Sequence, residues 1–146
     1  MSGNRIFRGS TAEQPKSVSK PVTGALLPGT FVTIGATAFA QATAPAGRVG
    51  ILAHRDFYNQ DATTAYISGE TGIAYRVEPE LEFQVAVAAG TYTFGQELTI
   101  AASGRLAAAA STNVVVAFFD DASKAGVAQS AGALCDIVIA NSYTKA

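Results

Sequence analysis

The chain has 146 residues, of which 49% are apolar and only 14% are charged, and its formal net charge is −1. A typical domain has about 25% charged residues, whereas alanine alone supplies 29 positions here. This composition excludes intrinsic disorder, a disulfide-stapled scaffold and a strongly basic nucleic-acid-binding protein, which leaves a membrane protein or a protein whose surface is covered by other protein.

The first twenty residues are the most basic part of the chain, with four basic residues against one acidic residue. They lack apolar periodicity and are rich in Gly and Ser, so we expect residues 1–20 to form an extended arm that is unfolded when alone. An ordinary frayed terminus is the alternative. The adjacent Ile6 and Phe7 favour a binding arm, because they offer apolar area to bury. The predicted partner-binding residues are Arg5, Ile6, Phe7, Arg8, Lys16 and Lys20.

Residues 21–47 form the longest charge-free stretch, and they argue against a membrane protein. The stretch contains three prolines and four glycines, whereas a spanning helix needs about 20 consecutive apolar residues. The N-terminus also lacks the apolar core of a signal peptide. We therefore expect neither a membrane nor a nucleic acid as partner.

From residue 21 the pattern is that of one all-β domain, residues 21–146. Strands are expected at 30–34, 38–42 and 48–53, followed by a polar loop over 56–72 that holds at most a short strand at 65–67. Residues 80–87 show the cleanest alternation in the chain, with Phe83 and Val85 on a buried face and Gln84 and Ala86 on a semi-exposed one.

The second half of the chain continues with strands. They are expected at 91–94, at 97–100 and 105–107 around a Gly-containing hairpin loop, and at 113–119 and 134–140. Residues 121–129 allow one short turn, because Gly126 weakens any helix there. The expected fold is all-β and mainly antiparallel: a small β-barrel or β-tulip-like sandwich with an extended N-terminal arm and at most one short helix.

No group of residues in the sequence has the pattern of a catalytic site. His54 is the only histidine and no nucleophile-elbow motif accompanies it, while Cys135 lies in an apolar strand and is expected to be an inert core thiol. A pairing of these two residues stays open. The acidic residues at 78, 80, 82, 120 and 121 are interpreted as solvated faces or contacts for a basic partner, with an acid/base couple or a cation site as the alternatives. We predict no enzyme, no metal and no cofactor.

Three segments resemble the small decoration, or cement, proteins of tailed-bacteriophage capsids. They are residues 22–32 (VTGALLPGTFV), the hairpin at 95–106 (GQELTI followed by ASGRL), and the two strands at 114–119 and 134–140. The polar loop at 56–72 departs from that pattern. The resemblance implies a virion protein, made in the host cytoplasm, that binds the outside of the assembled capsid and braces it.

This resemblance also implies the partners of the chain. They are the major capsid protein and further copies of the same chain, with a trimer favoured over a dimer. An arm that contacts capsid protein or a neighbouring copy fits this role, because an added strand can pair with an exposed sheet edge. Two alternatives remain: a subunit of a self-assembling tube or pilus, and a small β-barrel enzyme or ligand-binding protein that uses His54 and the acidic residues.

Overall fold

The computed structural model describes residues 6–9, 15–54 and 62–146. It confirms an all-β fold, with 46% of residues in strands and mainly antiparallel pairing. The strands are β1 (Ser17–Pro21), β2 (Phe31–Ile34), β3 (Phe39–Gln41), β4 (Val49–Leu52), β5 (Thr71–Arg76), β6 (Glu82–Val87), β7 (Gly90–Thr91), β8 (Glu97–Ile100), β9 (Leu106–Ala108), β10 (Val114–Phe119), β11 (Ala128–Gln129) and β12 (Ala133–Thr144). Within the described ranges, the one helical element is the 3₁₀ turn η3 (Ala102–Gly104).

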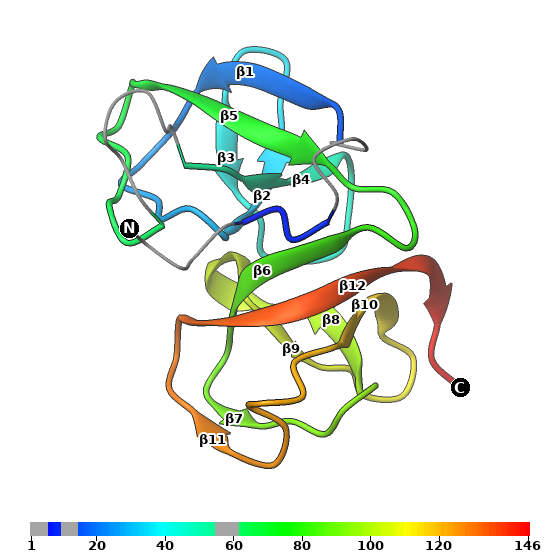
Figure 1. Cartoon of the computed structure of the whole chain (residues 1–146). Helices are drawn as coiled ribbons and strands as arrows, with labels where there is room; N and C mark the ends of the chain where they lie inside the picture. The colour runs from blue at the N-terminus through cyan, green and yellow to red at the C-terminus, as the bar shows by residue number, and fades with distance from the viewer. Residues whose placement is uncertain (1–5, 10–14, 55–61) are drawn as a thin grey trace.

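The first half of the chain forms a five-stranded antiparallel sheet, called here the first lobe, with strand order β1-β5-β4-β2-β3. Its strands are short and rich in β-branched and aromatic side chains, which suit a pleated, half-buried surface. The sheet curls, because Val22, just after β1, bridges Phe39 on the strand at the opposite edge. Figure 1 shows this lobe above the rest of the molecule.

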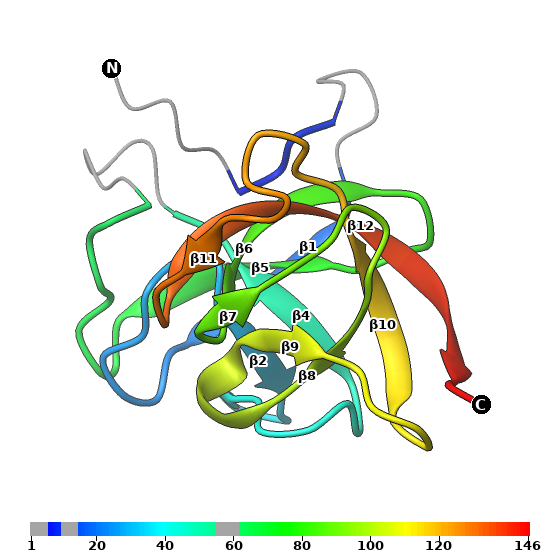
Figure 2. The same cartoon turned by 90° about the horizontal axis from the view of Figure 1, so that it is seen from below.

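The second half of the chain forms a closed barrel, called here the second lobe, with strand order β10-β12-β6-β9-β8. The predicted hairpin is present: β8 and β9 pair antiparallel, with Ile100 opposite Leu106. The barrel closes through a single parallel contact between β6 and β9, at Val87 and Leu106. The short ribbon of β7 and β11 lies at the end of the barrel away from the first lobe (Figures 1 and 2).

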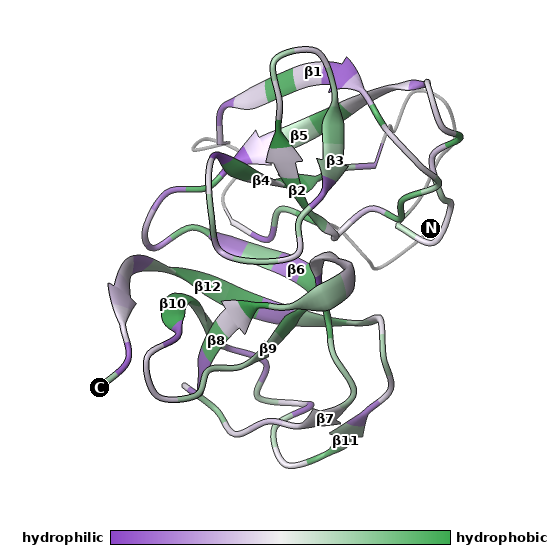
Figure 3. Ribbon diagram, turned by 180° about the vertical axis from the view of Figure 1, so that it is seen from behind, coloured by the Kyte–Doolittle hydropathy of each residue, from purple (hydrophilic) through white to green (hydrophobic). Residues whose placement is uncertain are grey.

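One hydrophobic core runs from the barrel into the first lobe. Phe31 and Ile51 of the first lobe belong to the same cluster of buried side chains as Phe83 and Leu98 of the barrel. A second cluster lies within the first lobe and contains Phe39. In Figure 3 the most hydrophobic ribbon segments lie within the strands, while polar colours are frequent in the connecting loops.

The contact between the lobes corrects one expectation about β6. Its outer face was predicted to be semi-exposed, yet Gln84 is only 6% exposed and Ala86 is also buried. The reason is that the first lobe lies close to β6, where the Ala86 amide at the strand edge donates to the Gly29 carbonyl across 3.0 Å and every side chain from Phe83 to Val87 is buried. β6 is therefore covered on both faces.

Other differences concern strand boundaries. β1 crosses the expected arm boundary at residue 20, because residues 17–21 pair antiparallel with β5. β5 itself begins inside the polar loop expected at 56–72. No strand forms at 65–67, and β12 continues to Thr144, past its expected end at 140. The turn expected within 121–129 is present over residues 122–126.

Candidate functional site

The candidate site is the outer edge of β6, where residues 6–9, called here the N-terminal segment, lie against the chain's own body. Phe7 and Phe83 form an antiparallel bridge. Two backbone hydrogen bonds flank it: Gln84 N–H donates to the Ile6 carbonyl at 2.7 Å, and Arg8 N–H donates to the Glu82 carbonyl at 2.9 Å. This edge is thus shared by three segments along the strand: the N-terminal segment, Gly29, and β9.

Apolar packing holds the N-terminal segment in place. Ile6 is 0% exposed and belongs to the core that joins the lobes. Phe7 is half-buried, with its ring centroid 5.6 Å from that of Phe83 and 6.1 Å from that of Tyr75. Ile6 was predicted to contact a partner, but in this structure its partner is the core of its own chain.

An ion pair closes the outer end of the same contact. Arg8 Nε lies 3.2 Å from Asp136 Oδ1 on β12, and about one third of each side chain is exposed. Burial raises the pKa of Asp136 above its ordinary value, and the positive charge of Arg8 acts in the opposite direction. The charge of Arg8 thus offsets part of the cost of burying this carboxylate.

The remaining predicted partner-binding residues lie elsewhere. Arg5 is outside the described residues. Lys16 is exposed just before β1, and Lys20 on β1 donates from Nζ to the Ala36 carbonyl at 2.8 Å. Lys20 belongs to an edge strand, where Lys and Pro discourage pairing with other chains, and Lys16 directly precedes it. The structure therefore places them on the first lobe, away from the barrel strands that Arg8 contacts.

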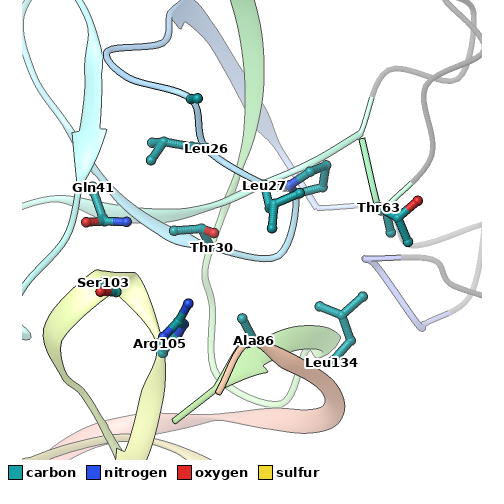
Figure 4. Close-up of a pocket in the computed structure, with 13 residues that line it drawn as sticks. Leu26, Leu27, Thr30, Gln41, Thr63, Ala86, Ser103, Arg105 and Leu134 are labelled. Carbon is teal, nitrogen blue, oxygen red and sulfur yellow. The ribbon is translucent and has the colours of Figure 1, made fainter. Parts of the chain in front are cut away.

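A pocket of about 310 Å³ opens between the lobes, next to β6 and β12. Leu26, Leu27, Thr30 and Gln41 line it from the first lobe, and Ala86, Ser103, Arg105 and Leu134 from the barrel (Figure 4). Its lining mixes apolar side chains with polar ones and includes one guanidinium group, that of Arg105. The sequence pattern did not indicate it, because its two walls come from segments far apart in the chain.

The chemistry-bearing residues of the sequence do not converge on this pocket. Cys135 is buried on β12, and burial raises its pKa to about 11, as expected for an inert core thiol. His54 follows β4 in the first lobe. Within the described part of the chain, no group of three or more His, Cys, Asp or Glu side chains is placed to hold a metal ion.

Four of the exposed large apolar side chains lie on neighbouring segments as two pairs, and a further one, Tyr143, lies near the end of β12. Leu27 and Ile67 are 47% and 71% exposed, and their segments are joined by the hydrogen bond from Tyr66 N–H to the Leu26 carbonyl. Phe94 and Val127 are 60% and 53% exposed, and Gly126 N–H joins their segments at the Tyr92 carbonyl. The first pair belongs to the first lobe and the second pair to the barrel. No pattern in the sequence singled out these four residues.

Comparison with known proteins adds no family. Neither a scan against protein-family models nor a search of curated proteins returned a match. Among the residues that the structure describes, no helix has the length and apolar character needed to cross a membrane.

Proposed function

We propose that this chain is a structural virion protein that binds the outer surface of a tailed-phage capsid and stabilises it by bridging neighbouring capsid subunits. The observation that carries the proposal is the presence of two exposed apolar pairs on different lobes of one body. Leu27 and Ile67 provide one contact point, and Phe94 and Val127 provide the other. A protein that braces a shell needs two separate contact points on a body that does not bend between them.

The connection between the lobes supports this role. The common core and the hydrogen bond between Ala86 and Gly29 join the two lobes, so force applied at one contact point is carried to the other. The scarcity of charge supports it as well, since charged residues are depleted at the buried centre of protein interfaces. The N-terminal segment adds a third element that can reach capsid protein or a neighbouring copy.

The test is to mix the purified protein with undecorated shells of its own phage and to image the shells by electron microscopy. We expect regular density on the outer surface and a higher temperature of shell disruption. Replacing Phe94 and Val127 by Ser, or Leu27 and Ile67 by Ser, should weaken binding in each case. The two double variants together should abolish it, while circular dichroism shows that the fold is retained.

Three outcomes would contradict the proposal. Shells that stay undecorated at high protein concentration would remove the capsid role. Long polymers formed by the protein alone would favour a tube or pilus subunit instead. Normal decoration by the quadruple variant would show that the two apolar pairs are not the contact points.

A further inference from the structure

We propose that the N-terminal segment exchanges between copies of this chain, so that residues 6–9 of one copy pair with β6 of the next. This inference rests on the proposed function, because it names a second copy as the partner of that segment. It identifies the acceptor site as the β6 edge between Glu82 and Gln84, together with Asp136 on β12.

The acceptor site needs an occupant. Without the N-terminal segment, the amide of Gln84 and the carbonyl of Glu82 lose their hydrogen-bond partners. The fully buried side chain of Ile6 also leaves a gap in the core that joins the lobes. Unpaired backbone groups and core cavities both destabilise a fold, so an empty site is the least stable arrangement.

The same segment of another copy fits this site as well as the chain's own segment does. An identical segment reproduces the bridge to Phe83, the buried position of Ile6 and the ion pair of Arg8 with Asp136. Exchange of an identical element between protomers is a low-cost route to association, because no new contact has to be made.

Proximity decides between the two arrangements. The six peptide units from Gly9 to Pro15 allow a reach of about 20 Å at most, which limits exchange to copies whose β6 edges lie within that distance. A high local concentration of copies, as on a shell, favours the exchanged form. The segment docked on its own body is then the form of the isolated protein.

Reversing one charge in each of two copies tests this directly. In Arg8→Glu, the new carboxylate faces Asp136 of its own body; in Asp136→Arg, Arg8 faces a second guanidinium. Each change places two like charges together when the segment docks on its own body. In a mixture of the two variants, each segment that docks on the other variant's body again meets a residue of opposite charge. We expect native mass spectrometry to show heterodimers in about threefold to tenfold excess over the statistical mixture, given the modest strength of exposed pairs.

The matched control is Lys16→Glu, a charge reversal at an exposed site just before β1. Mixed with the wild-type chain, it should give only the statistical distribution. Removing residues 1–9 from both copies should eliminate the heterodimer excess. A mixture of Arg8→Glu and Asp136→Arg with no more heterodimer than this control would overturn the exchange.

A second pair of variants covers the case in which charge reversal impairs folding. Arg8 lies opposite Glu82 in the antiparallel register, so Arg8→Cys in one copy and Glu82→Cys in another should form an intermolecular disulfide on mixing. Recovery of monomers alone under oxidising conditions would contradict exchange. These measurements contain no shells, so their failure leaves shell binding by the docked form to be judged separately.

Discussion

At the scale of single residues, Gly104 determines how closely the two lobes approach. It lies in the loop between β8 and β9 with φ at +65°, a region that other residues enter only with strain. A Cβ at this position would lie 2.6 Å from the Phe31 carbonyl oxygen and 2.5 Å from Thr30 Cγ2. The glycine of the hairpin motif is therefore needed for backbone conformation and for space at the contact with the first lobe.

Replacing Gly104 with Ala is expected to destabilise the fold by about 2–4 kcal/mol, the sum of the positive-φ cost and the overpacking cost. Urea unfolding followed by circular dichroism measures this value. The control is Gly126→Ala, since Gly126 has φ at +76° but nothing within 4 Å of the added Cβ. It should lose only about 1–2 kcal/mol. Equal losses in the two variants would show that contact with Phe31 and Thr30 is unimportant.

At the scale of elements, the turn after β10 is anchored by the buried carboxylate of Asp121. Ser123 Oγ donates to Asp121 Oδ1 at 2.7 Å, and the Asp136 amide donates to Oδ2 at 3.2 Å, which ties the turn to β12. Burial acts to raise the pKa of Asp121, but these hydrogen bonds and the charge of Lys124 outweigh it, and the pKa is lowered. The ionised form is thus the one that stabilises the fold.

Asp121→Asn should lower the free energy of unfolding at pH 7 by about 1.5–3 kcal/mol, the usual value for hydrogen bonds to a charged group. A carboxyl with a lowered folded pKa contributes stability above its unfolded pKa and loses that contribution as the pH falls through the folded one. The gap between wild type and variant should therefore close as the pH is lowered below about 4.

Denaturant unfolding across a pH series measures this gap. Asp136→Asn provides the contrast, because burial raises the pKa of Asp136. In that case the stability of the wild type relative to the variant should rise as the pH falls. A pH-independent gap for Asp121→Asn would contradict the anchoring role of the carboxylate.

The elements also show what the sequence could and could not predict. Strands such as β6 and β10 were predictable, because alternating or continuous β-branched and aromatic residues identify them locally. β1 has Val18 as its only apolar residue between Ser and Lys, so its strand conformation comes from pairing with β5. Such long-range pairing leaves no local signal.

The candidate site was predicted only in part. Ile6 and Phe7 stood out as apolar residues in a polar segment. Their packing on their own chain depends on the part of the β6 edge that β9 leaves unpaired. The ion pair of Arg8 with Asp136 depends on β12 lying beside β6. The burial of Gln84 likewise comes from a second lobe that local alternation cannot reveal.

At the scale of the whole molecule, the shared core predicts that the two lobes unfold together. Cys135 provides a probe in the barrel: it is 0% exposed, and its raised pKa of about 11 keeps the thiol protonated at neutral pH. Because the thiolate is the reactive form, a disulfide reagent should modify Cys135 only after unfolding.

A substitution that leaves a cavity in the first lobe should therefore make the Cys135 thiol in the barrel react faster, because both lobes unfold more often. Phe39 is fully buried in the cluster confined to the first lobe, and Phe39→Ala should cost about 3–5 kcal/mol. When the lobes unfold together, the labelling rate of Cys135 under native conditions should rise by the factor that corresponds to this loss of unfolding free energy. Labelling kinetics measured beside urea unfolding give both numbers, and an unchanged labelling rate would show that the lobes unfold independently.

The shared edge of β6 also has a consequence for how the chain acquires its structure during synthesis. Residues 6–9 are made well before β6, the strand that receives them, which begins at Glu82, and the neighbouring β12 begins only at Ala133. Contacts between such distant segments require long loops to close before they stabilise anything, which slows folding. Residues 6–9 must therefore wait until β6 has been made before they can dock, and the barrel cannot close before β12 is available.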